Sequence, residues 1–514
     1  MRRILPCIAA ALASLLAGCA SLPSLDGRSA TTALAETSGT RLGQALAEKI
    51  AANPGRTGVH PLFDPRDAFA ARVLLAAAAE RSIDVQYYIW HGDQVGHLLF
   101  ESLWRAAGRG VRVRLLLDDL NTGGLDPVIA ALDAHPDIEV RLYNPFARRG
   151  ARMLDFLTDF ARVNRRMHNK SFTVDNQASV LGGRNIGNEY YGVGGGMIFA
   201  DLDVLAVGAA VRDVSRQFDL YWNSPSAYPA ASLAGAPGPE AAGQLEAAFA
   251  ATRADAQSLA HLEAVRTTPL VRDLLAGRLG LEWTRARLVH DDPSKTLDAA
   301  SPADVLLFPE VVRVIGRPEK TFDLVSPYFV PGEEGTAALA ALAGRGVKVR
   351  VLTNSLSAAE ASVVHSGYAK RRHDLLRAGV RLFELKATAG VKSHEDRGGL
   401  GSSSSAALHA KTFAVDRGRI FVGSFNFDLR SALLNTEMGL VVESPTLAGR
   451  LGEFFDTLVP HAAYEVRLLP GSSRLEWIER TDSGEVRHET EPRASWFRRL
   501  SVELLSILPI DWML

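Results

Sequence analysis

The chain has 514 residues, of which 47% are hydrophobic and 22% are charged. This composition is typical of a globular protein with room for two to four domains, and it excludes a disordered or fibrous chain. The formal net charge of -1 argues against a surface that binds nucleic acid throughout, although a local basic groove is compatible with that total.

The N-terminal segment resembles the signal peptide of a bacterial lipoprotein. A basic start, MRR, precedes an apolar run at residues 4–17 that is shorter than the roughly 20 residues of a membrane-spanning helix. The sequence LAGC at residues 16–19 resembles the box that is cleaved before a lipidated cysteine. We therefore expect a signal peptide at residues 1–18, lipidation of Cys19, and a flexible tether at residues 19–55. The alternative is an ordinary signal peptide followed by an incidental cysteine.

The predicted anchor sets the expected location of the protein. It implies attachment to the bacterial cell envelope with the chain facing the periplasm, and Ala20 after the cysteine favours the outer membrane. Cys7 would leave with the signal peptide, so the mature chain would form no disulfide. No later stretch has the run of apolar residues that a membrane helix needs.

Two stretches of the chain predict the same succession of elements. In the first, an apolar strand at residues 83–85 is followed by an Ala/Leu-rich helix, a glycine and a second strand at residues 111–114. Residues 322–324 and 347–350 repeat this order. Strands that alternate with helices predict an α/β fold, here with two duplicated lobes that each contain a mixed, largely parallel β-sheet flanked by helices.

The duplication also predicts the domain organisation. We expect an N-terminal lobe at residues 56–230 and a C-terminal lobe at residues 286–460, joined by a mostly helical connector at residues 231–285. Residues 461–514 are expected to form a hairpin and an amphipathic tail. Two such lobes suggest a pseudo-dimer with a single active site at their interface.

The most specific repeat is a polar motif that occurs once in each lobe. Residues 168–190 are HNKSFTVDNQASVLGGRNIGNEY, and residues 409–431 are HAKTFAVDRGRIFVGSFNFDLRS. Both begin with His-x-Lys, continue with Phe-x-Val-Asp and reach an asparagine after a glycine turn. The histidine and the asparagine are 17 positions apart in both copies. One copy would have little meaning, but two with the same spacing favour a functional site over a coincidence.

Strand geometry predicts which side chains of the motif act together. Because side chains alternate between faces, His168 and Lys170 project to one side, as do His409 and Lys411. The glycine-rich bend that follows is expected to present an asparagine beside each pair, and these residues are Asn185 and Asn426.

The aspartates of the motif are expected on the opposite face of the strand from the histidine and the lysine. Asp175 and Asp416 lie near predicted turns, so we expect them to support the site from behind rather than to touch a substrate.

These residue types suit the transfer of a phosphodiester group. A neutral imidazole can attack phosphorus and form a covalent phosphohistidine, while a second, protonated imidazole gives its proton to the leaving alkoxide. Two lysines and two asparagines would stabilise the phosphoryl oxygens, a role that metal ions often fill. The motifs show no ligand spacing for a metal, so we expect neither a metal nor another cofactor.

Each histidine needs an acceptor for its second ring nitrogen. The candidates are Asp203 and Glu437, which follow the histidines of their own copies by 35 and 28 positions. We attribute the difference to an insertion at residues 192–196 in the first copy. Asp201 is the alternative for the first of these two roles.

The paired motifs resemble the signature of the phospholipase D superfamily. Further segments are similar to bacterial cardiolipin synthases, especially those of the C type; they are residues 326–331, 364–368, 426–431 and 434–437. The resemblance implies a two-lobed fold, a metal-independent phosphohistidine mechanism, and transfer of a phosphatidyl group onto a hydroxyl of phosphatidylglycerol. It assigns the nucleophile to His168 and the acid/base role to His409.

One departure from this family leaves alternatives open. The commonest cardiolipin synthases begin with transmembrane helices, whereas this chain begins with a lipoprotein-like signal. A periplasmic site would let water compete as acceptor, so a phospholipase D-type hydrolase that releases phosphatidic acid is the first alternative. A phosphodiesterase or nuclease is less favoured, because nucleic-acid binding depends on clustered cations. A non-enzymatic scaffold conflicts with the intact motifs.

The expected partners are phospholipids and a membrane. Phosphatidylglycerol is the first candidate substrate, phosphatidylethanolamine is the second, and nucleic acid is disfavoured. The tail at residues 496–514 combines aromatic, basic and apolar residues, which suits either a membrane interface or a helix packed on the protein. His365 and Tyr368 are candidates for head-group selection or, equally, for packing.

Overall fold

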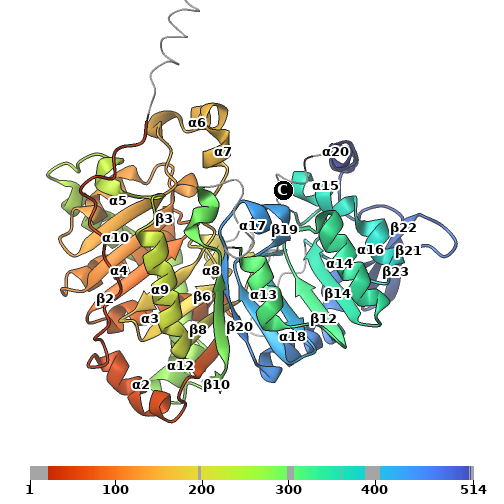
Figure 1. Ribbon diagram of the computed structural model, residues 1–514, viewed down its shortest axis with the longest axis horizontal. Helices are drawn as coiled ribbons and strands as arrows, with labels where there is room; N and C mark the ends of the chain where they lie inside the picture. Colours follow the sequence, from red (N-terminus) through yellow and green to blue (C-terminus); the bar gives the residue numbers. More distant parts are fainter. Residues whose placement is uncertain are drawn as a thin grey trace, which may run out of the picture.

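The computed structural model describes residues 21–194, 198–297, 306–359, 362–387, 406–508 and 510. Two α/β lobes lie side by side, each built on one large sheet (Figure 1). The predicted signal peptide, Cys19 and the last four residues of the tail lie outside the described residues. None of the helices in the described ranges combines the length and the apolar character required to cross a bilayer.

The N-terminal sheet has nine strands among the described residues. In spatial order they are β10 (Glu282–Thr284), β1 (Thr57–Leu62), β8 (Asp203–Gly208), β6 (Ala178–Gly182), β5 (Ser171–Val174), β2 (Ser82–Tyr87), β3 (Arg112–Asp118), β4 (Ile138–Tyr143) and β9 (Ala227–Pro229). The helices that cover this sheet include α3 (Pro65–Ala78), α4 (Gln94–Ala107), α5 (Asp126–Asp133) and α9 (Ala209–Trp222). Helices α10 (Ala241–Ala254), α11 (Ala256–Arg266) and α12 (Pro269–Leu275) form an outer layer on α3, α4 and α5.

The C-terminal sheet has ten strands among the described residues. Their order is β11 (Ala286–His290), β20 (Met438–Val442), β18 (Arg419–Gly423), β17 (Lys411–Val415), β12 (Thr321–Val325), β14 (Lys348–Asn354), β15 (Arg381–Leu385), β21 (Ala463–Leu468), β22 (Leu475–Thr481) and β23 (Gly484–His488). Its helices include α13 (Leu307–Ile315), α14 (Gly332–Gly344), α15 (Ser362–Ala369), α16 (Arg372–Arg377) and α18 (Pro445–Thr457).

The two sheets confirm the predicted duplication. The order β8-β6-β5-β2-β3-β4 in the first lobe matches the order β20-β18-β17-β12-β14-β15 in the second. The segment that the sequence predicted as a hairpin is not separate from the C-terminal lobe, because β21 pairs with β15 and extends its sheet.

The prediction that the sheets are largely parallel is wrong in detail. Parallel pairs join only the central strands, β2-β3-β4 in one sheet and β12-β14-β15 in the other, and the remaining described pairs of both sheets are antiparallel. The reason lies in the connections. Parallel neighbours need a helical crossover, whereas β5 and β6, like β17 and β18, are joined by a tight turn that makes them antiparallel.

Each of these turns depends on the motif aspartate. Asp175 and Asp416 adopt left-handed backbone conformations, with φ of 49° and 52°, which aspartate tolerates better than most residues. The Asp175 carboxylate accepts three backbone N–H groups at the start of β2, at 2.8–3.0 Å. The Asp416 carboxylate does the same before β12, at 2.7–3.0 Å. In both lobes the aspartate therefore fixes the end of the strand that follows the histidine to the start of the central strand.

The expectation of a flexible tether at residues 19–55 is wrong for most of that segment. Helix α2 (Arg41–Ala51) forms there, and the Thr40 side chain caps it by accepting from the backbone N–H of Gly43. Upstream, the Arg28 guanidinium donates to the carbonyl oxygens of Asn223 and Ser224 beyond the end of α9. Helix ends leave carbonyl groups without partners, and an arginine satisfies them. This part of the chain is thus packed onto the N-terminal lobe.

The two lobes are joined through buried apolar side chains and one short strand pair. Strand β7 (Ile198–Ala200) pairs in parallel with β16 (Ala406–Leu408), one strand from each lobe. A single apolar cluster also spans the boundary, and its members include Val59, Leu181, Val204, Ala206, Val214, Leu288, Ile420, Val422, Met438 and Leu440. This contact fixes the edges of the two sheets relative to each other.

Candidate active site

The two histidines lie where the lobes meet, and each is hydrogen-bonded to the opposite lobe. The backbone N–H of His168 donates to the carbonyl oxygen of Thr436 at 2.8 Å. In the related arrangement, the backbone N–H of His409 donates to the carbonyl oxygen of Ala200 at 2.9 Å. Both histidine side chains are largely buried.

The acids that contact the imidazoles also come from the opposite lobe. His168 Nδ1 lies 2.9 and 3.0 Å from the two carboxylate oxygens of Glu437. His409 Nδ1 lies 2.5 Å from Oδ2 of Asp201. Since both imidazoles use Nδ1 for these contacts, Nε2 is in each case the ring nitrogen that has no carboxylate partner.

The expectation that each histidine uses the acid of its own copy, with Asp203 serving the first, is wrong. Glu437 serves the histidine of the other lobe, and Asp201 rather than Asp203 contacts His409. Asp203 lies in a different buried cluster, where it forms ion pairs with Arg72 at 2.8 Å and Arg184 at 3.6 Å. Asp203 thus supports the packing of the N-terminal lobe.

The register of the two sheets explains why Asp201, and not Asp203, corresponds to Glu437. Gly182 pairs with Asp203, and the equivalent Gly423 pairs with Gly439, so the residue that corresponds to Glu437 is two positions before Asp203. The spacing from the motif histidine gives the same answer, because 201 - 168 = 33 exceeds 437 - 409 = 28 by the five residues of the insertion at 192–196. The sequence therefore contained the signal that favours Asp201.

The two lysines bring positive charge to both imidazoles. Lys170 Nζ donates to the carbonyl oxygen of His168 at 2.6 Å, and Lys411 Nζ lies 3.0 Å from Nε2 of His409. Burial, together with the charges of both lysines, lowers the pKa of His168 well below its usual value. Burial and Lys411 lower the pKa of His409 to about 3, against the opposing effect of Asp201. Both imidazoles are therefore neutral near pH 7 in the absence of a phosphate.

The charged groups around the imidazoles have shifted pKa values of their own. Burial lowers the pKa of Lys170 to about 7, although Glu437 opposes the shift. Burial also raises the pKa of Glu437 to about 7, opposed by the charge of Lys170. Asp201 differs, because the contact with His409 outweighs burial and holds its pKa below the usual range. The shared electrostatic interactions indicate one site rather than two separate ones.

The motif asparagines lie in different hydrogen-bond environments. Asn185 is held from both ends, since its Oδ1 accepts from the backbone N–H of Ile89 at 3.3 Å and its Nδ2 donates to the Tyr190 hydroxyl at 3.0 Å. Asn426 is also buried, and its Oδ1 has no hydrogen-bond partner in the described part of the chain. A flipped amide can present either atom, so Asn426 is suited to contact a substrate oxygen.

Several residues of this region were missed by the sequence analysis. Tyr88 packs edge-on against the His168 ring, with centroids 4.8 Å apart, and Tyr190 packs against His409 at 5.0 Å. The Ser424 hydroxyl donates to Glu437 at 2.5 Å, and Asp291 accepts from the Glu437 backbone N–H at 2.8 Å. None of these residues belongs to the repeated His-Lys-Asn pattern, which is why the repeat did not reveal them.

One group of potential metal ligands occurs among the described residues. His91, Asp93 and Glu189 each offer a ligand atom within 4.8 Å of the others. These atoms already have partners, since His91 Nδ1 lies 3.2 Å from Glu189 and Asp93 accepts the backbone N–H groups of Gly96 and Asn188. The group does not include either motif histidine.

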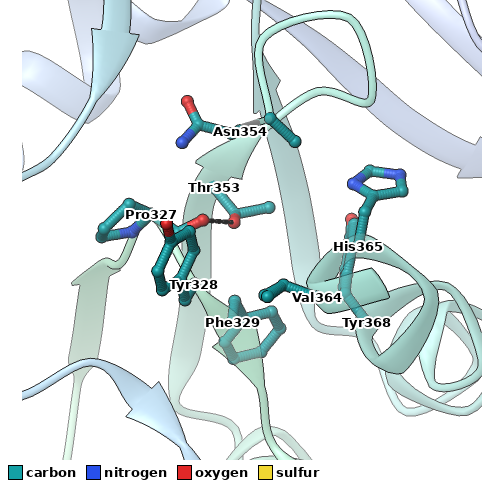
Figure 2. A pocket seen from close by; sticks show the side chains of 9 residues that line it. Pro327, Tyr328, Phe329, Thr353, Asn354, Val364, His365 and Tyr368 are labelled. Atoms are coloured by element: carbon teal, nitrogen blue, oxygen red, sulfur yellow. Dashed lines mark hydrogen bonds between the residues drawn. The ribbon is translucent and has the colours of Figure 1, made fainter. Parts of the chain in front are cut away.

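His365 and Tyr368 of α15 line a small hollow at the carboxyl end of β14, where Thr353 and Asn354 lie (Figure 2). The hollow encloses about 10 Å³, which is room for one water molecule and not for a glycerol head group. His365 Nε2 lies 3.0 Å from the Glu491 carboxylate, and the Tyr368 hydroxyl donates to Glu384 at 3.1 Å. Both residues thus take part in a buried polar cluster of the C-terminal lobe.

Comparison with known proteins identifies the family. The family pattern described as "Cardiolipin synthase, PLD-like domain" matches residues 74–218 and 311–459, once in each lobe. The chain belongs to this phospholipase D-like family. Cardiolipin synthase C of Escherichia coli strain K12 is 46% identical over 92% of this chain and 100% of its own length. An uncharacterized protein of Helicobacter pylori is 30% identical over 91% of this chain and 92% of its own length.

Among solved structures, a phosphatidylserine synthase of Haemophilus influenzae shares the fold of this phospholipase D-like protein. The match has a TM-score of 0.55 and covers 92% of this chain and all of that one, at 13% sequence identity. Such low identity supports the two-lobed fold and nothing finer.

The different positions of Asp201 and Asp203 predict different effects of the same substitution. Asp203→Asn leaves two buried arginines without a carboxylate, so we expect the free energy of unfolding to fall by about 3–5 kcal/mol in urea titrations. Asp201→Asn replaces the carboxylate partner of His409 by an amide, whose oxygen can still accept the backbone N–H of Leu202, so we expect a folded protein whose turnover falls by about a thousand-fold. A stable but inactive Asp203→Asn variant beside an active Asp201→Asn variant would contradict this assignment.

Proposed function

We propose that the chain is a phosphatidyltransferase that forms cardiolipin or a related phospholipid through a covalent phosphohistidine. The observation that carries this proposal is the crossed arrangement of the two half-sites, in which each imidazole is oriented by a carboxylate of the other lobe. This arrangement supplies two neutral imidazoles whose Nδ1 atoms are held by carboxylates, so that Nε2 is the reacting nitrogen of the nucleophile and of the general base; at His409 the substrate takes the place of the contact between Nε2 and Lys411. The chain belongs to a family whose description names cardiolipin synthase, and this membership supports the choice of a phospholipid substrate.

In the first half-reaction, His168 is the proposed nucleophile. Its Nε2 attacks the phosphorus of phosphatidylglycerol and forms a P–N bond, while the bond from phosphorus to the oxygen of the head-group glycerol breaks. Glu437, at Nδ1, stabilises the positive charge that develops on the ring. The anionic phosphate raises the proton affinity of His409, which gives its proton to the departing glycerol oxygen.

In the second half-reaction, His409 takes a proton from the hydroxyl of a second phosphatidylglycerol. The resulting oxygen nucleophile attacks the phosphohistidine, so that a new P–O bond forms and the P–N bond to His168 breaks. Lys170 and Lys411 stabilise the phosphoryl oxygens in both steps, with Asn426 as a further donor. The products are cardiolipin and glycerol. If water takes the place of the second lipid, the product is phosphatidic acid.

The proposed roles predict a bell-shaped dependence of turnover on pH with its maximum near 7. Below pH 7, Glu437 binds a proton and no longer balances the charge of the attacking imidazole; above pH 7, Lys170 loses the charge that stabilises the phosphate. We expect the Glu437→Gln variant to have a much lower turnover and a pH profile without an acidic limb. In the Lys170→Arg variant we expect the basic limb to shift to higher pH. An unchanged basic limb in Lys170→Arg would exclude Lys170 from this role.

The substrate assignment is tested by following the products of labelled lipids. Purified protein is incubated with phosphatidylglycerol, phosphatidylethanolamine or both, in the presence of EDTA. We expect cardiolipin as the main product, since a lipid hydroxyl is the proposed acceptor. His168→Ala and His409→Ala should each lower turnover by at least a thousand-fold without a change in the circular dichroism spectrum.

The other outcomes of this assay decide between the remaining functions. Phosphatidic acid as the main product would identify a hydrolase, and cleavage of DNA without lipid turnover would identify a nuclease. Substantial activity in either histidine variant would rule out the two-histidine mechanism. A rate that EDTA removes and divalent cations restore would rule out the proposed independence from metal.

We also propose that Cys19 is acylated and holds the chain to the periplasmic side of the outer membrane. The proposal rests on the LAGC box and on Ala20, which lie outside the described residues. Cells grown with labelled palmitate should therefore label the protein, and Cys19→Ser should abolish the label. Recovery of the labelled protein with inner-membrane fractions alone would contradict the outer-membrane location.

A further inference from the structure

The C-terminal helix α20 (Trp496–Ser506) has two faces of different character. One face packs on α15, where Val502 is buried and the Arg498 guanidinium donates to the Ser362 hydroxyl at 3.1 Å. The other face is apolar and exposed to solvent. At 100° per residue its side chains fall on one stripe, which continues just beyond the helix. The members of this stripe are Trp496, Phe497, Leu500, Leu504, Ile507 and Leu508.

A second exposed apolar group lies on the N-terminal lobe, on α6 (Met153–Thr158) and α7 (Phe160–Val163). Its members are Met153, Leu154, Leu157 and Phe160. The Leu157 side chain is 81% exposed. Isolated apolar side chains are ordinary on a protein surface, but a group of several on neighbouring turns of two short helices is typical of an interaction surface.

Both groups lie at the same edge of the molecule as the motif histidines. Helices α6 and α7 connect the carboxyl end of β4 to His168, so they lie at the carboxyl edge of the parallel strands. Helix α15 follows the carboxyl end of β14, and α20 packs on it. Figure 1 shows α6, α7 and α20 along one margin of the molecule, with α17 (Leu429–Leu433) between them. Leu433 of α17 is also exposed.

The start of the described chain lies at this edge as well. Arg28 donates to the carbonyl oxygen of Ala227 at 2.7 Å, and Ala227 pairs with Tyr143, the last residue of β4. The residue at which we expect acylation, Cys19, precedes Arg28 by nine positions. An acyl chain at that position would therefore approach the membrane from the same side as the apolar groups.

We propose that these two groups form a bipartite membrane-docking surface that sets the mouth of the active site onto a phospholipid bilayer. This inference deepens the proposed function and rests on it for the orientation of the site. A bilayer is favoured as the occupant because the two groups belong to different lobes on either side of the site, and an extended flat surface reaches both. A helix with Trp, Phe and Leu on its exposed face and Arg499 beside that face is typical of helices that lie in a membrane interface.

Tryptophan quenching by lipids with brominated acyl chains tests this surface in the full, lipidated protein. Vesicles of phosphatidylglycerol and phosphatidylethanolamine are used, because quenching reports contact with acyl chains and needs no turnover. Trp496 is 69% exposed, whereas Trp90, Trp222 and Trp477 are buried and Trp104 and Trp283 are half-buried. Trp512, which lies outside the described residues, is replaced by Phe in every protein compared. The contribution of Trp496 is the difference in quenching between the protein that retains Trp496 and its Trp496→Phe variant. We expect most of the quenching to be lost in that variant.

The N-terminal group is tested with a matched pair of reporters in the Trp496→Phe background. Leu157→Trp should restore quenching, and Leu275→Trp should not. Leu275 is 82% exposed, almost the same as Leu157, but it ends α12 at the opposite margin of the molecule. We expect quenching at least two-fold greater for Leu157→Trp than for Leu275→Trp.

The possible results separate this proposal from the proposed function. Equal quenching of the two reporters, or none from Trp496, would overturn the docking surface even if the same vesicles are turned over. Quenching without lipid turnover would support the docking surface and contradict the proposed phosphatidyltransferase activity. A dimer in lipid-free solution that Trp496→Phe dissociates, with no quenching by brominated lipid, would assign the stripe to a second copy of the chain and overturn the proposal.

Discussion

The structure depends on one reciprocal interaction, in which each lobe completes the imidazole–carboxylate pair of the other. His168 belongs to the N-terminal lobe and its acid to the C-terminal lobe, while His409 has the reverse arrangement. Backbone hydrogen bonds at the two histidines repeat the same crossing. Neither lobe contains a complete half-site by itself. Activity is therefore tied to the packing between the lobes, and the apolar cluster at their boundary supports the chemistry as well as the fold.

Burying these charged groups costs desolvation free energy, which the site offsets by placing lysines near carboxylates. Two buried lysines lie near two buried carboxylates, so each charge reduces the desolvation cost of another. The two pairs are not equivalent. Burial raises the pKa of Glu437, whereas contact with His409 keeps the pKa of Asp201 low. This electrostatic difference breaks the symmetry that the duplicated sequence suggests, and it gives a physical basis for different roles of the two histidines.

The same chain topology that assembles the site also determines what surrounds it. Loops and short helices at the carboxyl ends of the parallel strands carry the histidines and the apolar group of α6 and α7, and helix α20 and the first described residues pack at the same edge. Enzymes that act on lipids must bring a bilayer substrate to a buried, polar site. An arrangement with apolar groups on either side of such a site suits that requirement, because the lipid can leave the bilayer without crossing a wide layer of water.

The sequence determined the duplication, the α/β class, and the identity and spacing of the paired His, Lys and Asn residues, because each of these is local and occurs twice. It also placed Asp175 and Asp416 at turns. It did not determine the direction of most strands, the packing of Arg28, or the acid that serves each histidine. The decisive contacts join residues that are 208 and 269 positions apart. Only the packing of one lobe on the other decides such contacts, since each copy of the repeat also contains an acid that its own histidine could have used.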